Sequence, residues 1–598
     1  MTRTAWKIAL RFASRLNVFI VVVTFLVGSA SAQESPLAQL PANTSIVFQV
    51  RGVERTKNRL VAFLKNALPD LAPMVEAQMD EAIKNGFDGG RHLNGLYKDG
   101  PHFLILTDLP MPGSDQQPKM AGVLRLTNYQ DFVKGLLKEE EFKGLKPTKD
   151  GYDVAMMGNE ETYFIDRKDY VLVTPNKELA GQLAKKGPGF DGKLKPDIAK
   201  KLLDADVSTF VDMNIVNKEF GGQIQSFRQL FDLGFAQAGE QLGKANAEMI
   251  KGMFEGFFQF VEDSSGILLA AEFRPEGLAF HLQAQVGPDS RTNALFKSTQ
   301  KSTFENLGQL PAGQLAFTGL SLAGPNYKLF QLMTQGAIED EAKEIKTALA
   351  DLEKSGPEVW IGSFQMPIQG IQITTYKDPV KASAAQLKLM QGLKQGENFM
   401  NIALKSKPDV KPEAQNYQGF KLHSASFVWD YEKTVEKQGG QQLPEETRKQ
   451  MAEAMKKMMG EQANLWFGTN GKEYVQVTAK DWAAAQTLLN QFLEGKSAIK
   501  DQKAYQDTRK LLPPQTTFLA LVDALPYFQA MGNYFLSVMK SVPLPIAIPV
   551  QSLPAVKGEP AYLGFAVTLE SGTGGMDFWL PASAVKEVRK LVDAVLGK

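Results

Sequence analysis

The sequence predicts an α+β protein of two homologous halves, each built from curved antiparallel sheets with helices packed on one face. Three observations predict this fold class. Segments that alternate apolar and polar residues are followed by segments with apolar residues three and four positions apart, the patterns of half-exposed strands and amphipathic helices. Similar segments recur in the same order in the first and second parts of the chain. A basic and then apolar N-terminus precedes them and differs from both.

Residues 1–32 are predicted to be a secretory signal peptide. Basic residues precede the apolar run Val18–Gly28, and Ala30-Ser31-Ala32 supplies the small residues of a cleavage site. The apolar run has 11 residues, fewer than the ~20 that span a bilayer. We therefore expect cleavage after Ala32 and a periplasmic or extracellular location for a soluble remaining chain. Retention of the segment as a membrane anchor is the alternative.

The composition excludes several kinds of chemistry. The 598 residues include four His and no Cys, which rules out disulfides, thiolate metal sites and a Cys nucleophile. Without residues 1–32 the chain carries 63 basic and 66 acidic residues, a balance that does not attract nucleic acid. We therefore expect no nucleic-acid partner and no cofactor.

The two predicted halves are residues 33–300 and 301–598. In the best-matching pair of segments, which start at Tyr170 and Tyr474, six identities share an offset of 304 residues. The other pairs, in chain order, are Leu40-Pro41-Ala42 with Leu310-Pro311-Ala312, Gly100-Pro101 with Gly356-Pro357, Gly122–Leu137 with Gly370–Leu387, Leu202-Leu203 with Leu511-Leu512, and Gly266–Phe296 with Tyr562–Val595. Such an order indicates an internal duplication with loop insertions. Chance alignment of generic strand-and-helix patterns is the alternative.

Individual elements follow from local pattern. The predicted strands include Ile46–Val50, Phe103–Thr107, Leu315–Thr318 and Val359–Phe364, and a hairpin over Leu465–Val477 turns at Asn470-Gly471. Apolar spacing predicts helices around Leu179 and over Val585–Val595. The charged segment Lys405–Asn416, with two prolines, is predicted to be a solvated loop.

Two helical regions are unusually rich in Met or Phe. A helix after Leu443 carries four methionines largely on one face, and a helical hairpin over Phe220–Phe260 carries eight phenylalanines. We expect most of these side chains to pack in a core, although such faces also suit an apolar partner. If the protein binds an apolar ligand, we expect the site between the Phe-rich helices and a sheet.

No catalytic, cofactor-binding or metal-binding residues are predicted. His92, His102, His281 and His423 lack the spacing of metal ligands, and we expect them at the surface or at strand ends. Ser-x-x-Lys pairs, such as Ser298 with Lys301, occur without the Lys-Thr-Gly strand that accompanies them in penicillin-binding enzymes. The alternative is a hydrolase whose carboxylates or serine come from distant segments of the chain.

Two segments that lead into strands carry a short shared motif, Leu40-Pro41-Ala42-Asn43-Thr44 and Leu512-Pro513-Pro514-Gln515-Thr516. The motif resembles one in a broad group of uncharacterised exported bacterial envelope proteins, which also have a signal peptide and repeated α+β units. The resemblance implies an envelope location and no activity. We therefore predict an exported, non-enzymatic envelope protein that binds a partner protein or an apolar ligand.

Overall fold

The computed structural model describes residues 35–595, apart from 86–89, 111–115, 243, 325, 328–329, 331–342, 438–442, 542–551 and 555–556. The predicted signal peptide, residues 1–32, lies outside the described residues. The chain forms two compact units. Unit 1 comprises the residues up to Gln225 together with Ser264–Gln285, and unit 2 comprises Ser226–Asp263 together with the residues from Val286 onward. The division therefore differs from the predicted boundary at residue 300, because 226–263 and 286–300 belong to unit 2.

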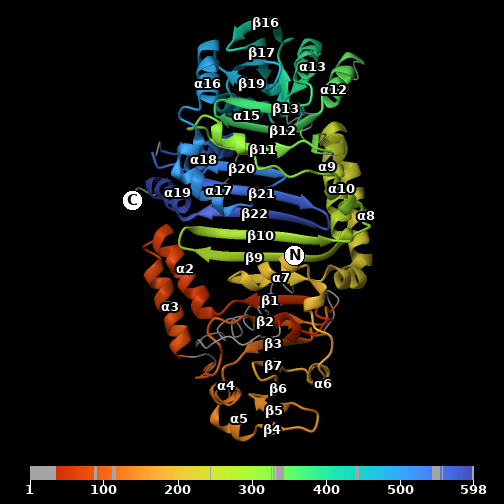
Figure 1. Ribbon diagram of the computed structural model, residues 1–598, viewed down its shortest axis with the longest axis vertical. Helices are drawn as coiled ribbons and strands as arrows, with labels where there is room; N and C mark the ends of the chain where they lie inside the picture. Colours follow the sequence, from red (N-terminus) through yellow and green to blue (C-terminus); the bar gives the residue numbers. More distant parts are fainter. Residues whose placement is uncertain are drawn as a thin grey trace. The chain divides into compact units, whose positions relative to one another are not determined.

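Unit 1 is built on an antiparallel sheet with the strand order β4-β5-β6-β7-β3-β2-β1-β8-β9-β10 (Figure 1). Its strands are β1 Ile46–Val50, β2 His102–Leu106, β3 Met120–Arg125, β4 Lys146–Pro147, β5 Asp153–Met157, β6 Glu160–Asp166, β7 Tyr170–Thr174, β8 Val207–Val211, β9 Ser264–Arg274 and β10 Gly277–Val286. Its helices include α2 Val53–Ala67, α3 Ala72–Asn85, α4 Tyr129–Leu136, α5 Glu139–Lys143, α6 Lys177–Ala184 and α7 Pro196–Asp204. The long helix α8, Met213–Leu242, begins in unit 1 and ends in unit 2.

Two apolar cores lie on opposite faces of the unit 1 sheet. Helix α4 packs against Leu124 and Val171, whereas α6 packs against Val123 and Leu172. Because neighbouring residues of a strand point to opposite faces, these two sets lie on the two sides of the sheet. Helices therefore cover both faces, whereas the sequence pattern indicated one.

Unit 2 contains an antiparallel sheet with the strand order β16-β17-β18-β19-β13-β12-β11-β20-β21-β22 (Figure 1). Its strands are β11 Ala316–Ser321, β12 Pro357–Gln365, β13 Gln369–Tyr376, β14 Asn398–Phe399, β15 Ile402–Leu404, β16 Asp409–Tyr417, β17 Phe420–Asp430, β18 Gln462–Thr469, β19 Tyr474–Ala479, β20 Phe518–Asp523, β21 Tyr562–Glu570 and β22 Thr573–Pro581. The predicted strands and the hairpin at Asn470-Gly471 are confirmed, and the α+β fold class is confirmed.

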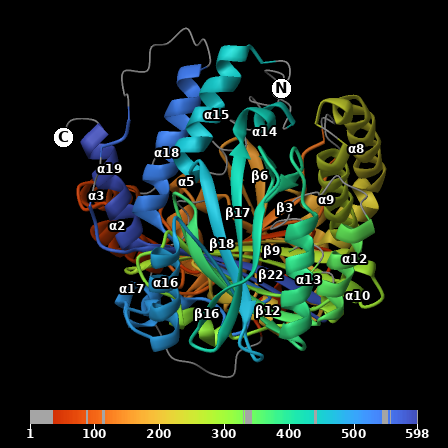
Figure 2. The same ribbon diagram turned by 90° about the horizontal axis from the view of Figure 1, so that it is seen from above.

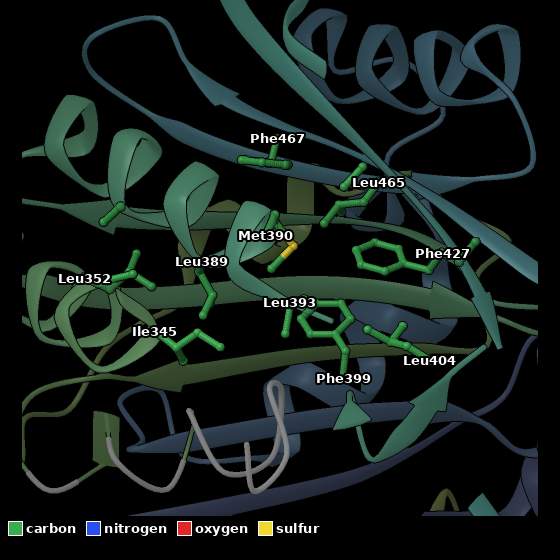
Figure 3. Close-up of a cluster of buried hydrophobic side chains, with 14 of the residues drawn as sticks. Ile345, Leu352, Leu389, Met390, Leu393, Phe399, Leu404, Phe427, Leu465 and Phe467 are labelled. Carbon is green, nitrogen blue, oxygen red and sulfur yellow. The ribbon is translucent and has the colours of Figure 1, made fainter. Parts of the chain in front are cut away.

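The helices of unit 2 include α9 Lys244–Asp263, α10 Arg291–Ser298, α12 Lys343–Lys354, α13 Pro379–Gly392, α14 Tyr431–Lys437, α15 Glu445–Met459, α16 Trp482–Glu494, α17 Lys503–Leu511, α18 Ala524–Ser541 and α19 Ala582–Val595. Helices α15 and α18 lie alongside each other (Figure 2). The main core joins α12 and α13 to β17 and β18, with Leu389, Met390, Phe427 and Leu465 among its buried side chains (Figure 3).

The two units share one order of strands. Each strand of unit 1 from β1 to β10 has a counterpart at the same place in the unit 2 sheet, so that β3 and β7 correspond to β13 and β19. The helices follow this order too, since α4 and α13 follow β3 and β13, α6 and α16 follow β7 and β19, and α7 and α17 precede β8 and β20.

The sequence match at offset 304 is out of register by one residue. Gly122 pairs with Val173 in unit 1 and Gly370 pairs with Thr478 in unit 2, which places Val173 and Thr478 at equivalent positions, 305 residues apart. Tyr170 accordingly packs in the core beside α6, whereas Tyr474 packs in the core beside α13. A shift of one residue along a strand moves every side chain to the other face, so the matched tyrosines are not equivalent.

The predicted loop Lys405–Asn416 is wrong for most of its length. Residues 409–417 form the edge strand β16, which is mostly exposed and pairs with β17. Its register shifts between Lys411 and Gln415, around Pro412. An edge strand tolerates proline at a bulge because no second neighbour needs the missing N–H.

Candidate ligand-binding cavity

Unit 2 contains a cavity of about 80 Å³ on the face of the sheet that α13 covers. Strands β13, β17, β18 and β19 form its floor, and α13 contributes Gln386. The remaining lining comes from Tyr327 and Phe330, from Ile368, and from Phe399 and Met400. The cavity thus borders the main unit 2 core, to which Tyr376, Phe427 and Leu465 belong.

Stacked aromatic side chains form one wall of the cavity. The rings of Phe399 and Phe427 are 4.8 Å apart with planes at 16°, and those of Phe427 and Trp429 are 5.6 Å apart with planes at 6°. Phe427 and Trp429 share a face because they are two residues apart on β17. Phe399, Phe427 and Leu465 lie together in Figure 3.

Polar side chains form the floor, at a place where a sheet normally buries apolar ones. Gln372 of β13 and Gln476 of β19 are directly paired across the two strands. Thr374 and Thr478 lie two residues further along these strands and line the same cavity. Gln372 accepts a hydrogen bond from Trp360 Nε1 at 3.3 Å, and Gln476 Nε2 donates to the Tyr474 hydroxyl at 3.1 Å. Gln372 Nε2 and Gln476 Oε1 have no hydrogen-bond partner among the described residues.

Trp429 carries a buried donor that no described residue satisfies. Its side chain is 4% exposed, and its indole Nε1 has no hydrogen-bond partner among the described residues. Burying an N–H without an acceptor costs about 1–3 kcal/mol. It is one of several buried side-chain atoms of the described residues that have no hydrogen-bond partner.

The electrostatic character of the cavity is neutral. None of its lining residues is Asp, Glu, Lys, Arg or His. Burial raises the pKa of the lining Tyr376, and also that of the neighbouring Tyr474, so both phenols are neutral near pH 7. The cavity can therefore offer stacking, apolar contact and neutral hydrogen bonds.

The equivalent place in unit 1 is filled with apolar side chains. Leu124 and Val171 are paired as Gln372 and Gln476 are, two residues beyond Gly122 as Gln372 is beyond Gly370. Leu124 is 2% exposed and Val171 is 0% exposed, and both pack with α4. In unit 1, β3 and β7 therefore present two buried apolar side chains to α4. The equivalent strands of unit 2, β13 and β19, present two amides beside a cavity.

The cavity is not at the predicted place. The Phe-rich hairpin is formed by α8 and α9, and neither helix contributes to the cavity lining. Core packing holds for Phe258, which is 5% exposed, but Phe227 is 62% and Phe257 56% exposed. On the Met-rich helix α15, Met455 and Met459 pack against the unit 2 core, as expected.

The histidines and the Ser-x-x-Lys pair do not form a site in the described part of the chain. His102, at the start of β2, accepts from Arg125 N–H at Nδ1 and lies 3.0 Å from the Tyr97 carbonyl oxygen at Nε2. The Ser298 hydroxyl donates to the Leu295 carbonyl oxygen, and Lys301 pairs with Glu570. Among the described residues no group of three His, Asp or Glu side chains is placed to hold a metal ion.

Gln372, Gln476 and Trp429 were not predicted as functional residues. The sequence did contain one indication of Gln372. When the matched segments Gly122–Leu137 and Gly370–Leu387 are aligned, Leu124 aligns with Gln372. That substitution replaces an apolar side chain by a polar one on a strand predicted to be buried. The partner strand could not be placed beside it without the correct register.

Comparison with models of known protein families and with curated proteins finds no match. A solved structure described as crystal form I of TP0453 is similar over 43% of this chain and 81% of its own, with 9% sequence identity and a TM-score of 0.22. A similarity this low carries no argument about function. No described helix combines the length and the apolar character needed to cross a membrane.

Proposed function

We propose that the protein is an exported, non-enzymatic envelope protein that binds a small, largely apolar ligand in the unit 2 cavity. The Gln372–Gln476 pair is the observation that carries the proposal. Two amides occupy positions that are apolar and sealed in unit 1, beside a cavity and an unsatisfied Trp429 N–H. Both glutamines are partly exposed, so a molecule that enters the cavity can reach their amides.

We propose that an internal duplication produced the two units. The common strand order and the helices that follow the same strands support it. In this proposal unit 1 keeps the sealed form of the scaffold and unit 2 carries the binding site. Export rests on the predicted signal peptide at residues 1–32.

The cavity favours binding over the alternative of a hydrolase. Hydrolysis of the kind considered needs a pair of carboxylates or a serine with a base, held within reach of one bond. The cavity lining contains neither a carboxylate nor a serine, and burial raises the pKa of its Tyr376. If the protein instead binds a partner protein, the exposed apolar side chains of α8 and α9 would form the contact.

The proposal is tested with the double variant Q372L/Q476V, which introduces the residues of unit 1. Protein purified from its native envelope is unfolded in methanol, and the extract is analysed by mass spectrometry. We expect a small apolar molecule, near one per chain, from the wild type and not from Q372L/Q476V.

The control is Q365L/Q369V, because Gln365 and Gln369 are also paired across β12 and β13, with Nε2 and Oε1 3.3 Å apart, but lie outside the cavity. This variant should keep the molecule. Recovery of the same molecule from Q372L/Q476V, or of none from the wild type, would contradict the proposal.

A further inference from the structure

We propose that unit 1 carries a second binding site, at the end of helix α6, for a small amphipathic anion with one carboxylate or phosphate group on an apolar body. This site is separate from the unit 2 cavity and does not rest on the function proposed above. The cavity lies on the face of the scaffold that α13 and its counterpart α4 cover, whereas α6 lies on the other face.

The site is a hollow of about 380 Å³ between the end of α6 and the segment 38–43, which leads into β1. An apolar cavity of ~150 Å³ admits benzene, and ligand pockets begin near ~300 Å³. The hollow therefore has room for a molecule larger than one ring. Its lining includes the exposed residues Gln182, Lys185 and Pro188, so a ligand can enter from solvent.

The lining combines apolar surface with positive charge. Pro41, Ala42 and Pro188 are at least partly exposed and offer apolar contact. Among the described residues that line the hollow, Arg167 and Lys185 carry a charge and none is Asp or Glu. An anion with an apolar body matches both parts of this lining, because Arg binds carboxylate or phosphate oxygens through two parallel N–H groups.

The end of α6 does not by itself account for two basic residues. Arg167 Nη2 donates to the Leu183 carbonyl oxygen, one of the last carbonyls of the helix, and this bond holds the guanidinium at the hollow. A helix C-terminus carries about half a negative charge, which Arg167 alone exceeds. With Lys185 the hollow has an excess of about one and a half positive charges, which an anion would balance.

Unit 2 has a glycine at the position of Arg167. Tyr170 and Val475 hold equivalent places in the pairing of β7 with β3 and of β19 with β13. On the neighbouring strands, Arg167 lies opposite Tyr170 and Gly468 lies opposite Val475. The guanidinium is therefore a feature of unit 1 and not of the shared scaffold.

Unit 2 also has an additional helical turn where unit 1 has the hollow. The N-cap residues Asn176 and Asp481 begin α6 and α16, and Gly189 and Ala498 form equivalent bridges after these helices. Gly189 follows its N-cap residue by 13 positions and Ala498 by 17, a difference of about one turn. Phe492, in the last turn of α16, is buried, whereas α6 ends at the hollow.

Four probes separate the two parts of the proposed ligand. Octanoate and octyl phosphate have an anionic group and an apolar chain, 1-octanol lacks the charge, and acetate lacks the chain. Each is titrated into the full chain at pH 7, below its micellar concentration, and the affinity is measured by isothermal titration calorimetry. We expect at least one of the two amphipathic anions to bind about tenfold more tightly than 1-octanol and acetate, and the tighter one identifies the anionic group.

Variants locate the site. R167Q should weaken binding of the tighter anion about tenfold or more, because it removes the charged fork. The matched control is K177Q, which removes one positive charge from an exposed residue of α6 outside the lining and should change the affinity about twofold or less. Q372L/Q476V should leave the affinity unchanged, because these residues line the unit 2 cavity.

Each contrary result overturns a defined part of the inference. Equal affinity for 1-octanol overturns the anionic group, and equal affinity for acetate overturns the apolar body. Equal effects of R167Q and K177Q, or a loss of binding in Q372L/Q476V, overturn the location. If no probe binds the wild type, the site itself is overturned, and the function proposed for unit 2 is unaffected.

Discussion

Two buried polar side chains in this protein, His102 and Trp429, differ in their hydrogen bonding. His102 is 2% exposed, and both of its ring nitrogens face backbone groups, the Arg125 N–H and the Tyr97 carbonyl oxygen. Because Nδ1 accepts, Nε2 carries the proton and donates. Trp429 is buried to a similar extent but has no acceptor among the described residues. The first arrangement is complete within the described residues, whereas in the second the donor has no partner among them.

His102 should make stability depend on pH. Burial lowers its pKa from 6.5 to about 3 in the folded protein. The folded state therefore binds fewer protons than the unfolded state between these values, and the contribution of His102 is lost as pH falls from 6.5 toward 3. We expect H102Q to lose about 1–3 kcal/mol in the free energy of unfolding at pH 7 and progressively less at lower pH.

Urea unfolding of H102Q and the wild type at several pH values between 7 and 4 measures this difference. The exposed His92 provides the control, since H92Q should behave as the wild type does. A difference between H102Q and the wild type that stays constant with pH would show that His102 does not titrate as described.

At the level of elements, the α8–α9 hairpin shows that aromatic content does not by itself mean core. Phe231 and Phe254 are 4.1 Å apart, and Phe258 contacts Phe227, Phe231 and Phe257. Phe257 nevertheless stays largely exposed next to the buried Phe258. Neighbouring residues of a helix point about 100° apart, so one faces inward and the other outward.

Alanine substitutions at these two neighbours should differ sharply in effect. F258A removes a buried ring and should lower the free energy of unfolding by about 3 kcal/mol. F257A should change it by less than about 1 kcal/mol, because the ring is already in contact with water. Chemical denaturation measures both. Equal losses would indicate that Phe257 is covered in solution.

At the level of the whole molecule, the two units share one equivalent backbone hydrogen bond. The Leu40 carbonyl oxygen accepts from Phe190 N–H at 2.9 Å, and the Leu310 carbonyl oxygen accepts from Ile499 N–H at 2.9 Å. Both leucines are buried, at 1% and 0% exposure. In each unit this contact joins the segment before the first strand to the segment after α6 or α16. The Leu512 motif, by contrast, leads into β20 and has a different place in the fold.

Equivalent positions should respond alike to the same substitution. L40A and L310A should each lower the free energy of unfolding of their unit by about 2–5 kcal/mol, because each removes a fully buried side chain. Hydrogen exchange, which resolves the two units, measures the local losses. The exposed Leu71 and Leu443 serve as controls, one per unit. A large loss at one leucine and none at the other would contradict their equivalence.

The sequence by itself determined the α+β class, the hairpin at Asn470-Gly471 and most strands, because alternation and turn residues act within a few positions. Only the tertiary structure decided which face each strand buries, since Gln372 and Gln476 pair across about a hundred residues of chain. A slip of one residue in that pairing exchanges the two faces, and the match of Tyr170 with Tyr474 contained such a slip. The cavity is lined by residues of strands that are far apart in the sequence, so it depends on this register and local sequence patterns do not predict it.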